Sequence, residues 1–267
     1  MEEVPPFPLL ALVGQPELKT ALILGLVNPG IGGVLLSGPY GVGKSTAVRG
    51  LLDILPTVER ADETGTSHHE RVRLVELPLN ARMDDVVGGI NERVALEQSR
   101  VQIEEGVLAK AHRNLLYVDE INLLDPAVLD AILDAAAQGR AMVRRGAVTR
   151  LFPAQFVLIG SMNPEEGSLR PQILDRFGLR VWVAPLAEAQ ERLEVYRRTQ
   201  AFRTDPTIFR RAYAAQTEAL AEEVAAAREI MPHVMVPAPI EELALALIQD
   251  LHIPSHRAEI ACSKRAR

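Results

Sequence analysis

One short segment constrains this chain more than any other. Residues 38–45, Gly-Pro-Tyr-Gly-Val-Gly-Lys-Ser, match the phosphate-binding pattern G-x-x-x-x-G-K-[ST] without a mismatch. An apolar run at 33–36 predicts a buried strand before the segment, and helical spacing of apolar residues at 46–55 predicts a helix after it. The alternative is a chance match in a glycine-rich turn, which would not explain why a strand, the loop and a helix follow one another in this order. We therefore expect an α/β fold that binds a nucleoside triphosphate.

The pattern also assigns roles within the loop. The glycines let backbone N–H groups close around the phosphates, Lys44 reaches the β and γ oxygens, and the Ser45 hydroxyl holds magnesium. A nucleoside triphosphate and Mg²⁺ are thus the expected ligands. The residues expected to line this site are Gly38, Pro39, Tyr40, Gly41, Val42, Gly43, Lys44, Ser45 and Thr46.

Length, charge and cysteine content limit the kinds of protein that this chain can be. The 267 residues suffice for a large α/β domain with a smaller second one, and the net charge of -6 gives no reason to expect nucleic-acid binding. A single cysteine, Cys262, permits neither an internal disulfide nor a cysteine metal cluster, which suits the cytoplasm. The N-terminus lacks the pattern of an export signal, and no apolar run has the length of a bilayer, so we expect no membrane insertion.

A second chemical signal follows another apolar run. Residues 115–118 predict a buried strand that ends in Asp119 and Glu120. Acids at the carboxyl end of a strand face the ligand side of an open parallel sheet. Asp119 would hold magnesium through water, and Glu120 would orient and polarise the attacking water. The alternative is a helix-capping aspartate with a solvated neighbour, and the phosphate-binding loop upstream favours the catalytic interpretation.

Two later residues are weaker candidates. Asn163 follows a predicted buried strand at 156–160, where its amide suits a contact with the γ-phosphate or with water, although a turn asparagine before proline is the simpler interpretation. Arg176 ends a short helical stretch at 169–177 and has the chemistry of an arginine finger. A structural ion pair or a solvated position explains Arg176 equally well.

The rest of the chain predicts a central parallel sheet flanked by helices, followed by an all-helical lid. Composition changes near Pro185, so we place the nucleotide-binding domain at 1–185 and the lid at 186–267. The histidines, including the pair His68-His69, lack ligand spacing, so no histidine metal site is expected. Further expected elements are helices at 16–26, 91–98, 107–112, 129–138, 188–200, 206–231, 240–251 and 257–267, strands at 73–78 and 181–185, a polar surface loop at 56–71, and a hairpin at 141–152 turning at Arg145-Gly146.

Four segments together resemble the ATPase subunit of magnesium chelatase, the I-type subunit in the chelatase branch of the AAA+ ATPases. They are the loop at 38–45, Tyr-Val-Asp-Glu-Ile-Asn-Leu-Leu at 117–124, Gly-Ser-Met-Asn-Pro-Glu-Glu-Gly at 160–167, and Leu-Arg-Pro-Gln-Ile-Leu-Asp-Arg-Phe-Gly-Leu at 169–179. The resemblance covers nearly the whole chain. It implies that Asn163 is the first sensor, that Arg176 is a finger acting on the neighbouring subunit, and that Arg257 is the second sensor.

The resemblance also implies a function and partners. The family forms rings in which ATP hydrolysis drives magnesium insertion into protoporphyrin, within tetrapyrrole and chlorophyll synthesis. A second ATPase-like subunit and a large porphyrin-binding subunit take part. Two inserts of the family, at 77–106 and 141–152, would project from the ring and contact partners.

Two other functions stay open. A MoxR-like remodelling ATPase acting on a protein client is the alternative within the ATPase class. A scaffold subunit that does not hydrolyse nucleotide is the alternative outside it, although such relatives usually have eroded motifs. Lys44, Asp119, Glu120 and Arg176 all remain in this sequence.

Overall fold

The computed structural model describes residues 5–61, 67–90, 102–145 and 148–253. Five parallel strands form its central sheet in the order β4-β5-β8-β1-β9. The predicted core strands are all found, within a few residues of the expected bounds. They are β1 (Val34–Ser37), β4 (Leu74–Leu77), β5 (Leu115–Val118), β8 (Val157–Met162) and β9 (Leu179–Trp182).

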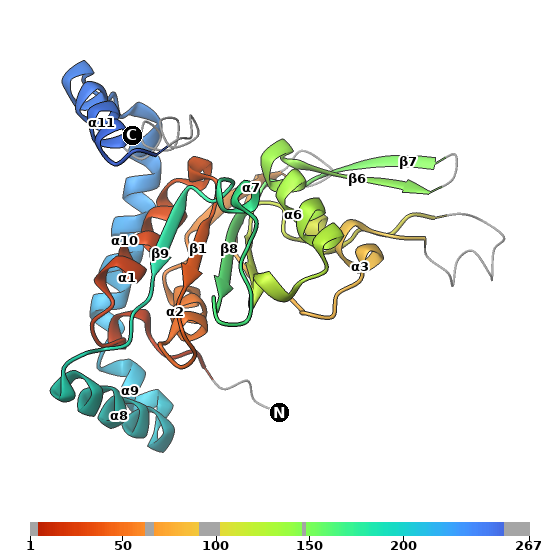
Figure 1. Cartoon of the computed structure of the whole chain (residues 1–267). Coiled ribbons are helices and arrows are strands. Elements are labelled where there is room, and N and C mark those ends of the chain that lie inside the picture. The colour runs from red at the N-terminus through yellow and green to blue at the C-terminus, as the bar shows by residue number, and fades with distance from the viewer. Residues whose placement is uncertain (1–4, 62–66, 91–101, 146–147, 254–267) are drawn as a thin grey trace.

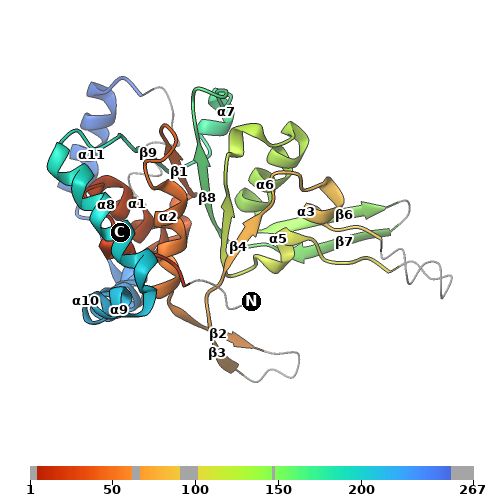
Figure 2. The same ribbon diagram turned by 90° about the horizontal axis from the view of Figure 1, so that it is seen from below.

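Alternating side chains of the sheet pack into two hydrophobic cores. Val34 and Leu36 of β1 enter one core, whereas Leu35 enters the other. Burial on both faces is typical of parallel sheets, which helices cover on both sides. Figures 1 and 2 show these two helical layers. One contains α1 (Pro16–Val27), α2 (Lys44–Gly50) and α10 (Ala214–Ile230); the other contains α3 (Met83–Val87), α5 (Val107–Lys110), α6 (Pro126–Gln138) and α7 (Pro171–Leu174).

Local capping signals account for several helix boundaries. Helix α1 begins with Pro16, whose missing N–H is not needed in a first turn. The Asp125 side chain accepts a hydrogen bond from the Ala127 N–H at the start of α6. Gly139 ends α6 with a φ of +69°, in the left-handed region that favours glycine, so the predicted stop is confirmed.

The prediction of a polar loop at 56–71 was wrong. Strands β2 (Thr57–Ala61) and β3 (Ser67–Arg71) pair there as an antiparallel hairpin, with Thr57 opposite Arg71. The hairpin extends away from the central sheet (Figure 2). Its strands, Thr-Val-Glu-Arg-Ala and Ser-His-His-Glu-Arg, lack the apolar alternation from which strands are recognised in a sequence. The second hairpin, β6 (Arg140–Arg145) and β7 (Val148–Pro153), confirms the one predicted at 141–152 and also projects from the body (Figure 1).

The single helix predicted at 206–231 was also wrong. The chain forms α9 (Pro206–Arg211) and α10 (Ala214–Ile230), with a break at 212–213. Phe209 and Tyr213 pack against each other with ring centroids 5.3 Å apart, and Phe209 also contacts the rings of Phe7 and Phe202. This tertiary packing outweighs the helical propensity of the segment.

The remaining described elements are two helices near the C-terminal end and several short turns. Helices α8 (Ala189–Thr204) and α11 (Ala238–Asp250) confirm two predicted helices, whereas the predicted helices at 91–98 and 257–267 lie outside the described residues. Helix α3 was not predicted. Short 3₁₀ turns occur at η1 (Leu9–Ala11), η2 (Pro29–Ile31), η3 (Leu51–Asp53), η4 (Ile121–Leu123) and η5 (Met231–His233).

The helical segment after β9 packs on the sheet domain. The Arg210 guanidinium pairs with Asp53 at 2.7 Å, and the Arg228 Nη1 donates to the Leu26 carbonyl at the end of α1 at 2.5 Å. The domain division at residue 185 stays a prediction.

Within the described ranges, no single helix is long and apolar enough to cross a membrane. Among the described helices, only the combined segment 214–233 and 238–250, whose two helices are bent by 102°, has that length and composition.

Candidate active site

The phosphate-binding loop connects the carboxyl end of β1 to α2. At Gly38 a Cβ atom would lie 2.3 Å from the Val183 carbonyl oxygen, so only glycine fits against β9. Gly41 and Gly43 have φ values of +75° and +91°, which side chains rarely adopt. The sequence therefore uses glycine where the backbone must turn tightly, and this turn places Lys44 at the first position of α2.

Lys44 lies inside the loop, with 8% of its surface exposed. Its Nζ donates to the carbonyls of Gly38 at 2.5 Å and Pro39 at 2.8 Å. Burial lowers the pKa of Lys44, whereas the nearby carboxylates of Asp119 and Glu120 act in the opposite direction. The loop carbonyls thus hold a desolvated cation where phosphate oxygens would replace them.

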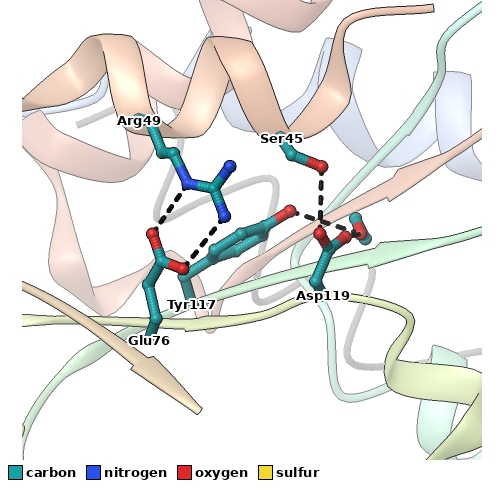
Figure 3. A network of polar contacts seen from close by, with 6 residues as sticks. Ser45, Arg49, Glu76, Tyr117 and Asp119 are labelled. Carbon is teal, nitrogen blue, oxygen red and sulfur yellow. Dashed lines mark hydrogen bonds and ion pairs between the residues drawn. The ribbon is translucent and has the colours of Figure 1, made fainter. Parts of the chain in front are cut away.

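Asp119 is the centre of a network of hydroxyl groups (Figure 3). The Ser45 Oγ donates to its Oδ2 at 3.0 Å, and the Ser161 Oγ donates to its Oδ1. The buried Tyr117 hydroxyl in turn donates to the Ser161 Oγ at 3.4 Å. Burial alone would raise the pKa of Asp119, but the hydroxyls of Ser161, Tyr117 and Ser45 hold it below its usual value. The carboxylate therefore stays ionised and oriented toward Ser45.

The sequence analysis assigned no role to Ser161, although this residue completes the network. The β5–β8 register pairs Val118 with Gly160, so the next positions, Asp119 and Ser161, lie side by side. Figure 3 also shows Arg49 of α2 paired with Glu76 of β4, through two contacts of 2.9 and 3.1 Å. This pair links α2, which begins at Lys44 and carries Ser45, to β4 of the sheet.

Replacing Ser161 with alanine is expected to weaken magnesium binding. Loss of its hydroxyl removes a hydrogen bond to Asp119, which raises the pKa of the carboxyl and loosens its orientation. Outer-shell partners of this kind are typically worth about tenfold or more in metal affinity. The magnesium concentration for half-maximal ATP hydrolysis should rise about tenfold. Ser161→Thr, which retains the hydroxyl, is the matched control, and an unchanged magnesium requirement in Ser161→Ala would contradict the role.

Glu120 has a strained backbone. Its φ of 50° and ψ of 47° place a non-glycine residue in the left-handed region. The Glu120 N–H donates to the Ser161 Oγ at 3.3 Å, so the same serine holds both acidic residues. Such strain is concentrated at functional sites, where the surrounding structure maintains it. Here it turns the chain at the end of β5 and brings Glu120 to the cavity beside Lys44.

Asn163 lies beyond the end of β8 and is 2% exposed. Its Oδ1 accepts from the Glu165 N–H at 3.2 Å, but its buried Nδ2 has no hydrogen-bond partner in the described part of the chain. A buried amide donor without a partner is costly unless a ligand satisfies it. Asn163 therefore holds a turn through its Oδ1, and its Nδ2 is left for a phosphate oxygen or a water.

These residues meet around one cavity of about 230 Å³. Its magnesium donors would be Ser45 and Asp119. Among the described residues, no group of three or more acidic, histidine or cysteine side chains is placed so that it could hold a metal ion without other ligands. This donor set fits Mg²⁺, which usually takes one or two carboxylates together with substrate phosphates. The lining residues are Tyr40, Gly41, Val42, Gly43, Lys44, Ser45, Thr46, Asp119, Glu120, Ser161, Met162 and Asn163.

A larger cavity of about 760 Å³ adjoins the loop. The sequence analysis did not predict it. It shares Tyr40, Gly41, Val42, Gly43 and Thr46 with the smaller cavity. The other walls come from Pro39, the N-terminal segment, Pro185 and Leu186, and α8. Apolar groups such as Phe7, Leu12, Val195 and Phe202 line it. A largely apolar cavity beside a phosphate site suits the base and sugar of a nucleotide. Its walls come from segments that are distant in sequence, so the sequence analysis predicted the loop residues of this cavity but not the cavity itself.

Arg176 lies at the other end of the sheet. The backbone carbonyl of Arg176 is near Gly32, and Phe177 is near Gly33, at the amino end of β1. The phosphate-binding loop follows the carboxyl end of this four-residue strand, about 13 Å away. Arg176 instead pairs with Asp134 of α6, with its Nη1 2.8 Å from Oδ1. It is therefore not part of the cavity of its own chain, and Arg257 lies outside the described residues.

This sheet, with a phosphate-binding loop after one strand and acidic residues after its neighbour, defines a P-loop ATPase of the AAA+ class. The family model described as "Magnesium chelatase, subunit ChlI" matches residues 9–175. The chain belongs to this family. The magnesium-chelatase 38 kDa subunit of Acidiphilium rubrum is 41% identical, with 98% of this chain and 83% of that relative covered.

Two further relatives agree with this assignment. The magnesium-chelatase subunit ChlI homolog of Methanocaldococcus jannaschii is 38% identical, with 98% of this chain and 78% of the relative covered. A cryo-EM structure of the complex between subunits BchI and BchD of magnesium chelatase aligns with a TM-score of 0.61 and 34% identity, covering 98% of this chain and 94% of that one. The predicted recognition and fold class are confirmed.

Proposed function

We propose that this chain is the ATP-hydrolysing motor subunit of a metal chelatase, driving magnesium insertion into protoporphyrin IX. The observation that carries the proposal is the meeting of Lys44, Ser45, Asp119, Glu120 and Asn163 around one cavity. The eroded site expected of a non-hydrolysing scaffold is not found. The relatives named as magnesium-chelatase subunits support the choice of metal and macrocycle. The cytoplasm stays the proposed location.

Each residue has a part in the hydrolysis of bound ATP. Lys44 exchanges its loop carbonyls for the β and γ oxygens, and Asn163 donates its unsatisfied Nδ2 to the γ-phosphate or to the attacking water. Glu120 orients this water and accepts its proton. Ser45 and, through water, Asp119 would hold Mg²⁺, which would neutralise charge on the phosphate oxygens.

We also propose that Arg176 completes the active site of a neighbouring copy. It lies at the opposite end of β1 from Lys44, so it cannot reach the nucleotide of its own chain without a large rearrangement. A homo-oligomeric ring, in which each chain supplies Arg176 to the next, gives this position a function. Arg257 is proposed as a second sensor on the lid. A second ATPase-like subunit and a large porphyrin-binding subunit would be the partners, and the solved complex of the relatives BchI and BchD supports the first of these.

The rate of hydrolysis per chain is expected to rise with protein concentration and then reach a plateau. An active site shared between two copies is complete only after assembly, so dilution removes Arg176 from its target. Magnesium-dependent phosphate release, measured from nanomolar to micromolar chain with Lys44→Ala as the blank, tests this. A rate equal to the blank at every concentration would contradict the ATPase motor. A constant rate above the blank would contradict only the shared site.

A second measurement separates the chelatase from a protein-remodelling ATPase. The chain is combined with its proposed partner subunits, protoporphyrin IX and MgATP, and magnesium protoporphyrin is detected by its fluorescence. We expect product only when both ATP and the chain are present, and no product with Glu120→Gln. ATP hydrolysis without any macrocycle product, together with co-purification of another protein client, would favour the remodelling ATPase.

A further inference from the structure

Two arginine–aspartate pairs connect α7 to α6. The Arg170 Nη2 contacts both carboxylate oxygens of Asp130, at 3.1 and 3.2 Å. Arg176 contacts Asp134 through Nη1 alone, 2.8 Å from Oδ1. Asp130 and Asp134 are one helical turn apart on α6, so they project from the same side of the helix. The two arginines flank α7, before and after it.

The backbone that carries Arg176 is firmly held. Phe177, the next residue, is 4% exposed and packs into the core beside α6. At Gly178 a Cβ atom would lie 1.8 Å from the Ile31 carbonyl oxygen, so the chain is pressed against η2 there. The backbone position of Arg176 is thus fixed. Its long side chain needs a further contact to hold one rotamer.

Asp134 supplies that contact and occupies only part of the guanidinium's hydrogen-bond donors. Arginine has five N–H donors in a planar fork, and Asp134 uses only the Nη1 side. Within the described ranges, no partner is found for the Nε and Nη2 of Arg176. The contrast is Arg49, which engages Glu76 through both Nε and Nη2 and has the geometry of a structural pair. The free edge of the Arg176 guanidinium remains available for a ligand oxygen.

We propose that Asp134 is the positioning residue for the Arg176 finger. This inference rests on the proposed role of Arg176 in a neighbouring active site. The carboxylate holds the guanidinium by one edge and presents the other edge to the phosphate of the adjacent copy. The Arg176 and Asp134 side chains are 32% and 57% exposed, so the pair contributes little to folding in the isolated chain. Its value lies in orienting a side chain that otherwise samples many rotamers.

Asp134→Ala is expected to lower kcat for ATP hydrolysis about tenfold, with KM and ATP affinity within twofold of wild type. The matched control is Asp130→Ala, which removes a comparable carboxylate one turn away and should change kcat less than twofold. In the Arg176→Ala background, Asp134→Ala should cause no further loss, because the positioned group is already absent. Equal effects of the two aspartate variants, or an additive loss in the double variant, would overturn the proposal.

Subunit mixing tests whether the defect acts between copies. Glu120→Gln chains retain the Arg176–Asp134 pair but lack the catalytic carboxylate. Added to Asp134→Ala chains, they should raise the rate per Asp134→Ala chain, because they supply oriented fingers to its intact sites. A rate that stays constant or falls would place the defect within the chain and overturn the inference. The proposed finger itself fails on a different result, namely an unchanged rate in Arg176→Ala.

Discussion

Replacing Arg176 with alanine is expected to lower the rate of ATP hydrolysis by about a thousandfold or more, while ATP binding stays intact. A positioned arginine that neutralises charge on the transferred phosphoryl group is worth about 10³- to 10⁵-fold, or about 4 to 7 kcal/mol of barrier. The loop and acids that we propose to bind ATP lie at the other end of the sheet, so removing this guanidinium should leave that cavity unaltered.

Two measurements check this result. Nucleotide affinity, from titration with a fluorescent ATP analogue, should match wild type, whereas steady-state phosphate release should fall to near the Lys44→Ala blank. Arg180→Ala, an exposed arginine four residues further along, is the matched control and should hydrolyse ATP at the wild-type rate. Mixing Arg176→Ala chains with Glu120→Gln chains should restore hydrolysis, because each variant supplies what the other lacks. Hydrolysis by Arg176→Ala at an unchanged rate would remove the finger.

The core of the fold was predictable because its physical causes are local. Buried parallel strands such as β5 and β8 are continuous apolar runs, and the glycines of the loop between β1 and α2 occupy positions where the backbone excludes other residues. The failures have non-local causes. The strands of the β2–β3 hairpin lack apolar alternation in the sequence and are held by pairing with each other. The break between α9 and α10 coincides with ring contacts that involve Phe7, about two hundred residues upstream in sequence.

The same distinction holds for the candidate site. Lys44, Asp119 and Asn163 were found separately, each just beyond an apolar strand, and the order of β1, β8 and β5 in the sheet brings them together. Ser161 has no local signal, since a serine at the end of a strand is ordinary. Its role depends on the register that places it beside Asp119. The position of Arg176, away from its own chain's cavity, likewise required the structure.

The conversion of Glu120 to glutamine is expected to give a chain that binds ATP but hydrolyses it about 10²- to 10⁴-fold more slowly. Glutamine preserves the size of the side chain and can adopt the same left-handed backbone, which is held from Ser161 through the Glu120 N–H. What it cannot do is accept a proton from the attacking water. The loss should therefore appear in kcat and not in ATP affinity.

Single-turnover hydrolysis with prebound ATP measures this step directly, because it excludes slow product release. The matched control is Glu165→Gln, an exposed carboxylate just beyond Asn163, which should retain the wild-type rate. A rate for Glu120→Gln within twofold of wild type would show that water is activated without this carboxylate. Catalysis would then not explain why Glu120 is held in a left-handed conformation. The expected result, slow hydrolysis by Glu120→Gln with unchanged ATP affinity, would instead connect the backbone strain with catalysis. The left-handed turn is the feature that brings the Glu120 carboxylate to the cavity.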